Sequence, residues 1–506
     1  MAGSAGHQGS GDIAEFQDGR YRIGQGWTAD HSRRRQIDVM ARGETDPPAK
    51  GRARNQARKL LFAGLLLVLG LGVLVVALSR ISSTAPTVSR LTGYLTDLFR
   101  QKDNSLSLVA VYSDDSEDSN FVNGVRMAVT QVNATRQKVL GKPLKLEFVR
   151  EAEATSVVPL ETIVSRTLKV SGKIAETDNL LAVIGHEWSD TAVTASSVYA
   201  RENVLFLATQ ATARSLTDHG FDTVFALQPD NSTNAHIVAS YALKQGLKRY
   251  IVLSDKTDYG KESANFFSEA VANEGAELVY RGFLSGTQRS IDELLMFVLD
   301  NKLFKRTDFD AFFIVSSSVQ ETSEFIKRAR YLGLDVPVLG MEYMFSEVIE
   351  ANVGKAGMKD VIGVSLYDRD AISEKGKAFA ADFESKFDRL PDLNAAIGYD
   401  ATLLIRDAVN RAESLDPNRV SDILKVSRYK NPFSGVTGPL VFDRNGLITD
   451  THVFVVRHDG TEFRTVDSIK IPLGPKSVLH LDPQDGKGSD ANQTEALPSA
   501  METIGQ

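Results

Sequence analysis

The chain has 506 residues and no cysteine. Disulfide bonds, thiolate metal ligands, a cysteine nucleophile and a cysteine-linked lipid are therefore excluded. The sequence also lacks a Gly-x-x-x-x-Gly-Lys-Ser/Thr phosphate loop, a Gly-x-Ser-x-Gly nucleophile turn and a His-Glu-x-x-His zinc motif. His186, Ser189 and Asp190 lie on one short loop, a spacing that does not suit a catalytic triad. We expect no enzyme activity, no metal and no cofactor.

Charge is distributed unevenly along the chain. Residues 1–59 carry 11 Lys and Arg against 7 Asp and Glu, whereas the whole chain has a net charge of -7. The long remainder is therefore acidic, which argues against nucleic acid as a partner. The short basic part precedes a hydrophobic run, and this order indicates a membrane.

A single hydrophobic run, Leu60–Leu78, contains no charged residue. Such a run is long enough to cross a hydrocarbon core about 30 Å thick, and we predict a transmembrane helix over residues 58–80. Lys and Arg crowd its N-terminal flank, so the N-terminus is expected in the cytoplasm and the large C-terminal part outside it. A cleaved signal peptide is the alternative. We favour an uncleaved anchor because more than 50 residues precede the run.

Four further segments follow from composition and periodicity. Residues 1–57 are predicted to be a disordered cytoplasmic tail, residues 81–104 a spacer, and residues 474–506 a disordered C-terminal tail. Between residues 105 and 473, short apolar runs alternate with helical patterns. The runs include Leu106–Tyr112, Leu144–Val149, Leu180–Ile184, Val204–Ala208, Tyr250–Leu253 and Phe312–Val315, and the helical stretches include Glu262–Asn273 and Ser318–Leu332. This alternation predicts an α/β fold with parallel sheets, and its length predicts two lobes.

Several short segments in this region resemble one protein family in their order and spacing. They are Asn123-Gly124-Val125, Gln210-Ala211-Thr212, Asp258-Tyr259-Gly260, Gly340-Met341-Glu342, Gly398-Tyr399-Asp400-Ala401 and Gly438-Pro439-Leu440-Val441-Phe442-Asp443. The chain from about 105 to 473 resembles type I periplasmic solute-binding proteins, specifically the leucine/isoleucine/valine-binding branch.

The resemblance implies two doubly wound lobes, flavodoxin-like in topology, that are joined by three crossing strands and hold the ligand in the cleft between them. Lobe 1 would comprise residues 105–228 and 366–442, and lobe 2 residues 229–365 and 443–473. The crossings are expected near Gln228-Pro229, Ser365-Leu366 and Phe442–Leu447.

Ligand-binding residues of lobe 1 are expected in the loops after two strands. Ser189 follows the strand Leu180–Ile184 and can cap a helix, whose N-terminus suits a carboxylate. The resemblance implies that the serine at this position binds the ligand carboxylate. It also implies contacts from Gln210, Ala211 and Thr212, although Gln210 replaces the small residue common in the family.

Lobe 2 contributes two further candidates. The resemblance implies that Tyr259 closes over the ligand and that Glu342 pairs with its ammonium group. Trp188, Phe121 and Tyr343 are candidates for the walls of the side-chain pocket. Carboxylates of the loop Ser113–Asn120 either favour a cationic or polar ligand or form an ordinary solvated loop.

These residues together predict an inner-membrane, single-pass solute-binding protein that captures an amino-acid-like ligand by hinge closure. Its expected partner is an ABC permease. The membrane anchor is unusual for the family, so two alternatives stay open: a receptor whose closure is sensed by a membrane partner, and a scaffold that keeps the fold without binding a ligand.

Overall fold

A computed structural model of the chain describes residues 104–113, 118–136, 138–151, 158–284, 288–300, 308–368, 373–427 and 430–472. Within these ranges, no helix is both long and apolar enough to cross a membrane. The predicted helix over 58–80, both predicted tails and residues 114–117 of the acidic loop Ser113–Asn120 lie outside the described residues. The anchor, and with it the membrane localisation, stays a prediction.

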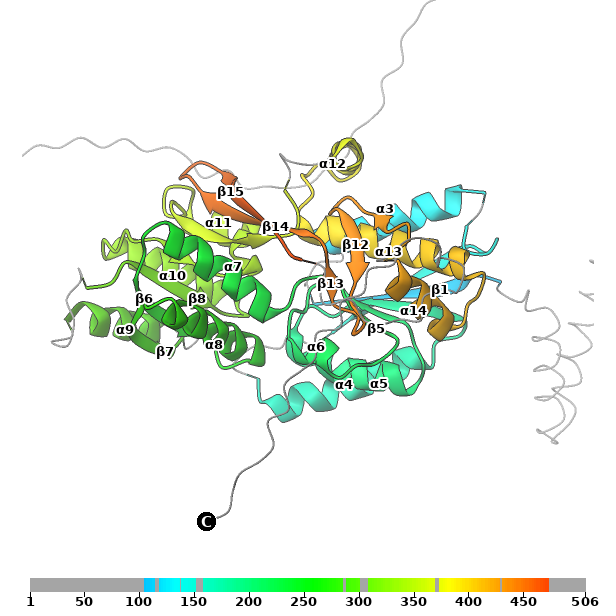
Figure 1. Cartoon of the computed structure of the whole chain (residues 1–506), viewed down its shortest axis with the longest axis horizontal. Coiled ribbons are helices and arrows are strands. Elements are labelled where there is room, and N and C mark those ends of the chain that lie inside the picture. The colour runs from blue at the N-terminus through cyan, green and yellow to red at the C-terminus, as the bar shows by residue number, and fades with distance from the viewer. Residues whose placement is uncertain are drawn as a thin grey trace, which may run out of the picture. The chain divides into compact units, whose positions relative to one another are not determined.

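One sheet is built from the N-terminal strands and is entirely parallel. Its order is β2-β1-β3-β4-β5. The strands are β1 (Leu106–Tyr112), β2 (Leu144–Arg150), β3 (Leu180–Gly185), β4 (Phe206–Ala208) and β5 (Val224–Ala226). The helices of this lobe are α3 (Asn120–Ala134), α4 (Leu160–Ala175), α5 (Ser189–Arg201), α6 (Ser215–Asp218), α12 (Glu374–Phe387), α13 (Leu393–Ala412) and α14 (Pro417–Val426), several of which are visible in Figure 1.

The second sheet has the order β15-β14-β10-β9-β8-β6-β7, in which β14 pairs antiparallel with both β10 and β15 and the other pairs are parallel. Its strands are β6 (Arg249–Ser254), β7 (Glu277–Phe283), β8 (Ala311–Val315), β9 (Val338–Leu339), β10 (Val361–Ser365), β14 (His452–His458) and β15 (Phe463–Lys470). Its helices are α7 (Asn231–Lys244), α8 (Asp258–Asn273), α9 (Gln288–Asp300), α10 (Val319–Tyr331), α11 (Glu347–Val353) and the 3₁₀ helix η1 (Glu342–Phe345).

The central strands of both sheets are buried on their two faces, which explains why these strands are continuous apolar runs. In β6, Tyr250 and Val252 join the core under α7 and α8, whereas Ile251 and Leu253 join a separate core under α9 and α10. This alternation follows the two-residue period of a strand. The expectation of a doubly covered α/β fold with parallel sheets is confirmed.

The chain passes between the two sheets three times. The passages lie between β5 and β6, after β10, and between β13 (Ile448–Thr449) and β14. β11 (Phe433–Ser434) and β12 (Pro439–Phe442) complete a small antiparallel sheet with β13. The turn before β13 lies against β5, because the N–H of Ala226 donates to the Gly446 carbonyl at 2.8 Å. The third passage is therefore a few residues later than the expected crossing at Phe442–Leu447.

One predicted strand boundary also differs from the structure. The run Val204–Ala208 was expected to be one strand, but β4 begins at Phe206. Val204 instead closes the end of α5, since its N–H donates to the Tyr199 carbonyl at 2.8 Å. The apolar run correctly predicted buried residues here, but it could not predict where the strand starts, because local hydrogen bonds determine that.

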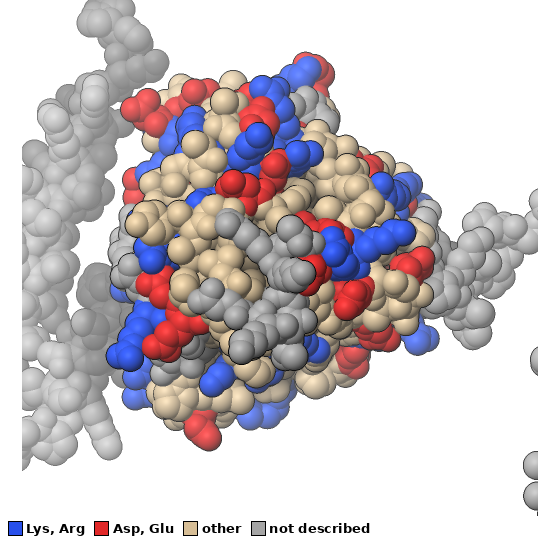
Figure 2. Space-filling model, turned by 90° about the vertical axis from the view of Figure 1, so that its left-hand side faces the viewer, with Lys and Arg blue, Asp and Glu red and all other residues tan. Residues whose placement is uncertain are grey.

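Charged side chains on the face shown in Figure 2 are interspersed. Lys and Arg alternate with Asp and Glu, and no broad area of that face carries one sign. A basic surface of the kind that binds nucleic acid is not visible on this side of the described residues.

Candidate ligand-binding site

The loop between β3 and α5 begins with a sharp turn that requires glycine. Gly185 has φ of +115°, and a Cβ there would lie 2.0 Å from the Val111 carbonyl oxygen. His186 follows in the left-handed region at φ 52°. The backbone therefore turns away from the sheet at once and carries residues 187–189 to the carboxyl edge, where open α/β sheets bind ligands.

A buried network holds this loop in place. Glu151, at the end of β2, accepts a hydrogen bond from the N–H of Glu187 at 2.7 Å and contacts His186 Nδ1 at 2.7 Å with its other oxygen. His186 Nε2 lies 3.0 Å from the Tyr199 hydroxyl. Burial, together with the nearby Glu151, raises the pKa of Tyr199 well above its usual range. His186 thus has a structural partner on each ring nitrogen.

The N-terminus of α5 points at the site without a side-chain cap. Ser189 was expected to be the N-cap, but it is the first helical residue; Trp188 occupies the cap position and no side chain caps the helix. The expectation of a capping role for the Ser189 hydroxyl is therefore wrong. Backbone N–H groups of the first helical turn have no intrahelical partner, so they are suited to bind a carboxylate.

The loop after β4 is held by hydrogen bonds from Gln228 and Asn231, in the segment that follows β5 and leads to the other lobe. Gln228 Nε2 donates to the carbonyls of Thr209 at 3.0 Å and Gln210 at 3.3 Å. The N–H of Asn231 donates to the Thr212 carbonyl at 2.8 Å. Ala211 is part of the apolar core below this loop, so its side chain does not line the site. A backbone contact from Ala211 stays a prediction.

Lobe 2 presents two loops that share one buried carboxylate. Asp255 accepts hydrogen bonds from the N–H of Thr257 at 3.0 Å and from the N–H of Ser317 at 2.6 Å. It also accepts from both hydroxyls. Gly260 packs against it, because a Cβ there would lie 2.1 Å from Asp255 Oδ1. Asp255 therefore sets the position of Thr257, Ser317 and the start of α8, which carries Tyr259.

Glu342 places a carboxyl group beside the lobe 1 loop. Its Oε1 lies 3.2 Å from Thr212 Oγ1, and its Oε2 is buried without a hydrogen-bond partner among the described residues. Burial raises the pKa of Glu342 to about 7, and the nearby hydroxyls of Thr212 and Tyr259 lower it by less. An acid in this position is poised between its neutral and charged forms near neutral pH.

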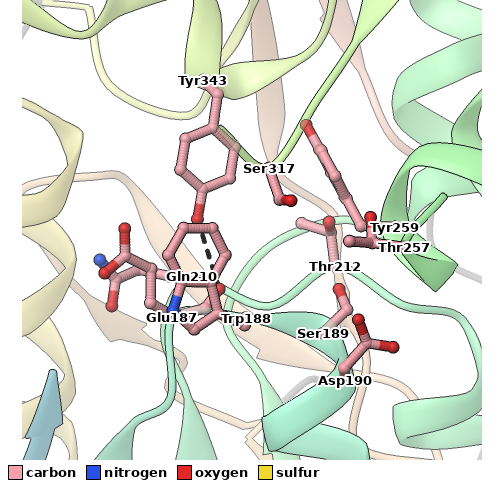
Figure 3. A pocket seen from close by; sticks show the side chains of 10 residues that line it. All are labelled: Glu187, Trp188, Ser189, Asp190, Gln210, Thr212, Thr257, Tyr259, Ser317 and Tyr343. Carbon is pink, nitrogen blue, oxygen red and sulfur yellow. Dashed lines mark hydrogen bonds between the residues drawn. The ribbon is translucent and has the colours of Figure 1, made fainter. Parts of the chain in front are cut away.

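Aromatic side chains from both lobes meet at this point. Trp188 and Tyr343 stack with ring centroids 6.2 Å apart and planes 3° apart, and Tyr259 packs edge-on to Tyr343 at 5.7 Å. The remaining cavity has a volume of about 10 Å³, which is room for roughly one water molecule. The side chains that line it, shown in Figure 3, are Glu187, Trp188, Ser189, Asp190, Gln210, Thr212, Thr257, Tyr259, Ser317 and Tyr343.

Two helix N-termini face each other at one side of this cavity. Asp190 lies in the first turn of α5 and Asp258 in the first turn of α8. Burial and then the charge of Asp258 raise the pKa of Asp190 to about 6. The two carboxyl groups therefore repel each other when both are ionised.

A family model described as "Periplasmic binding protein" matches residues 111–462. The chain belongs to the periplasmic binding protein family. A leucine-, isoleucine-, valine-, threonine- and alanine-binding protein of Pseudomonas aeruginosa is 24% identical over 316 residues, covering 60% of this chain and 80% of that protein. A Leu/Ile/Val-binding protein of Escherichia coli K12 is 23% identical over 339 residues, covering 67% of this chain and 84% of that protein.

Solved structures of other periplasmic binding proteins share the fold. A leucine-binding protein from Thermotoga maritima has a TM-score of 0.62 at 20% identity, covering 72% of this chain and 99% of that one. A solute-binding protein from R. palustris in complex with benzoate also reaches 0.62, at 16% identity, covering 74% of this chain and 100% of that one. Likeness at this level shows the fold and leaves the ligand open.

The structure brings together most of the residues that sequence reasoning proposed for this periplasmic binding protein. Trp188, Ser189, Gln210, Thr212 and Tyr259 line the cavity, and Glu342 contacts Thr212 beside it. Tyr343, one of the wall candidates, also lines the cavity. Phe121, the other wall candidate, belongs to the core under α3 and does not line the cavity.

Four lining residues were not proposed as ligand contacts: Glu187, Asp190, Thr257 and Ser317. Each lies in a loop or first helical turn that follows a parallel strand. The rule that such strand ends meet at one edge could have identified all four.

Proposed function

We propose that the protein is an extracytoplasmic solute-binding protein, held at the membrane by the predicted helix over residues 58–80. It captures an α-amino acid by closing its two lobes and presents the closed form to an ABC permease. The family membership supports a solute-binding role, and the site supports the choice of an amino acid.

The observation that carries the proposal is the buried carboxyl of Glu342, which lies near the hydroxyls of Thr212 and Tyr259 and whose Oε2 has no hydrogen-bond partner among the described residues. A buried carboxylate without a counter-ion is costly, and an ammonium group would satisfy it. No Lys or Arg is found among the described residues that line the cavity. We therefore expect a cationic group of the ligand to pair with the Glu342 carboxylate.

The opposite lobe offers the complementary half. The uncapped N-terminus of α5 carries a partial positive charge and free N–H donors, and the Ser189 and Thr212 side chains lie beside it (Figure 3). A carboxylate there and an ammonium at Glu342 fit the two ends of a zwitterion. Because the halves belong to different lobes, binding favours closure, as hinge-bending binding proteins do.

The test is the thermal stability of the full chain, freed of ligand by partial unfolding and refolding, against a panel of α-amino acids. A ligand at about 100 times its dissociation constant adds about 2.7 kcal/mol. We expect stabilisation by amino acids that is lost in Glu342→Gln and reduced in Ser189→Ala. Glu374→Gln, whose side chain is 91% exposed, is the matched control. Absence of stabilisation by every amino acid would contradict the proposal and leave a scaffold role.

A receptor role is the second candidate, and the predicted anchor with its basic cytoplasmic tail favours it. Both roles need the same ligand-driven closure. They differ in the partner: in membranes, the closed form would stimulate ATP hydrolysis by a permease in one case and co-purify with a signalling partner in the other. Stimulated ATP hydrolysis would exclude the receptor as the main role.

A further inference from the structure

The cavity has a second polar end, away from the residues proposed to hold the zwitterion. In Figure 3 the side chains of Glu187 and Gln210 lie together on the side opposite Ser189 and Asp190, and Trp188 lies between the two groups. In an α-amino acid whose ammonium and carboxylate meet Glu342 and α5, the side chain would extend toward this end.

Two buried polar atoms at this end lack partners among the described residues: Trp188 Nε1 and Gln210 Oε1. The two residues are 7% and 8% exposed, so water does not readily satisfy these atoms. Gln210 uses only its amide nitrogen, which donates to Asn394 Oδ1 at 3.4 Å. This second polar end of the cavity thus offers one unused donor and one unused acceptor. An apolar ligand side chain would leave both atoms buried and unpaired.

Glu187 adds a third polar group. Its carboxylate accepts a hydrogen bond from the Ser113 hydroxyl, and its N–H is held by Glu151. The loop network therefore fixes Glu187 at the cavity wall, where its oxygens favour a donor and repel an anion. The stacked rings of Trp188 and Tyr343 provide apolar walls for the methylene part of a side chain.

We infer that the ligand is an α-amino acid with a side-chain carboxamide, such as asparagine or glutamine. Its carbonyl accepts from Trp188 Nε1, and its NH₂ donates to Gln210 Oε1 and Glu187. A carboxamide supplies an acceptor and two donors on separate atoms, so it matches all three groups. A leucine side chain matches none, and a lysine or arginine side chain leaves the indole N–H without an acceptor. The inference rests on the proposed function.

The test is calorimetric titration of the ligand-free full chain with pairs of similar shape, asparagine against leucine and glutamine against methionine, and with lysine, arginine and threonine. With about tenfold per hydrogen bond, asparagine should bind about 100-fold more tightly than leucine. Gln210→Met and Trp188→Phe should each reduce that preference about tenfold. Gln245→Met, at the exposed end of α7, should change neither affinity.

Each outcome decides a separate point. Equal or tighter binding of leucine would overturn the carboxamide and leave the proposed function standing. Tighter binding of lysine or arginine would show that the ligand side chain is a cation and not a carboxamide. Tighter binding of threonine would show that it carries a hydroxyl. A preference that both variants retain would overturn the roles of Gln210 and Trp188. If no amino acid binds, the proposed function itself fails.

Discussion

The Thr212 hydroxyl of lobe 1 lies 3.2 Å from a carboxyl oxygen of Glu342 of lobe 2 and 2.7 Å from Asn231 Oδ1. Asn231 Nδ2 donates to Glu262 at 2.6 Å, which orients the amide so that its oxygen faces Thr212. A hydroxyl has one proton, and the shorter contact claims it. Donation from Thr212 to Glu342 therefore stabilises the charged carboxylate only weakly, and burial raises the pKa of Glu342 to about 7.

Replacement of this carboxyl should affect binding and stability in opposite directions. Glu342→Gln removes the charge that pairs with the ligand ammonium, and we expect amino-acid affinity to fall about 100-fold or more, since loss of one partner of a buried charge pair costs about 2–5 kcal/mol. At pH 8 the ligand-free variant should melt at a higher temperature than the wild type, because a buried charge is gone. Glu374→Gln should change neither the amino-acid affinity nor the melting temperature. Reduced stability of the ligand-free Glu342→Gln protein at pH 8 would contradict this account.

Ligand binding should release a proton near neutral pH. The pKa of Glu342 is raised to about 7 by burial, and an ammonium partner favours the charged form. Affinity should therefore fall as the pH is lowered from 8 to 6. Titrations at pH 6.5 in buffers of different ionisation enthalpy should reveal proton release of up to about one per ligand. Glu342→Gln should show a smaller pH dependence and little release; an unchanged pH profile would assign the proton to another group.

The facing carboxyls of α5 and α8 should make the ligand-free protein less stable as the pH rises. The folded-state pKa of Asp190 is raised from 3.8 to about 6. A raised carboxyl pKa gives stability that is present below pH 4 and lost as the pH rises through 6. Asp190→Asn should raise the melting temperature at pH 8 and leave it unchanged or lower at pH 4. Lys261 partly compensates the pair, so Lys261→Met should lower stability at pH 8. A rise that is equal at both pH values would exclude titration of Asp190 as its cause.

Replacement of Glu151, which does not line the cavity, should lower stability and weaken ligand binding. Glu151→Ala leaves the N–H of Glu187 and one nitrogen of His186 buried without an acceptor, at a cost of about 3 kcal/mol in the free energy of unfolding. We also expect weaker ligand binding, since this network positions the start of α5. Glu161→Ala, at an exposed position in the first turn of α4, is the control and should change stability by less than about 0.5 kcal/mol. Denaturant unfolding measures the stability of the two variants, and calorimetric titration measures their ligand binding.

The fold was predictable from sequence because its signals are local. Buried parallel strands are apolar runs, and the helices between them carry an apolar stripe, so alternation predicted the α/β fold and the length of the region predicted two lobes. Strand ends were less certain: the apolar Val204 continues the pattern of β4, yet its N–H bonds to α5.

The site was only partly predictable, because its support comes from residues distant in sequence. Glu151 lies 36 positions before Glu187, and nothing in its neighbourhood distinguishes it from a solvated glutamate. The resemblance supplied Thr212, Tyr259 and Glu342. It could not supply the role of the Gln210 side chain, since the family usually has a small residue at this position.

The small cavity also governs how fast a ligand exchanges. The cavity has room for about one water molecule, so an amino acid can enter only after the lobes separate, and it can leave only in the same way. Release is then a gated, first-order event whose rate cannot exceed that of hinge opening, a motion of microseconds to milliseconds or slower. A competitor in excess should therefore capture the emptied protein without hastening the departure of the first ligand.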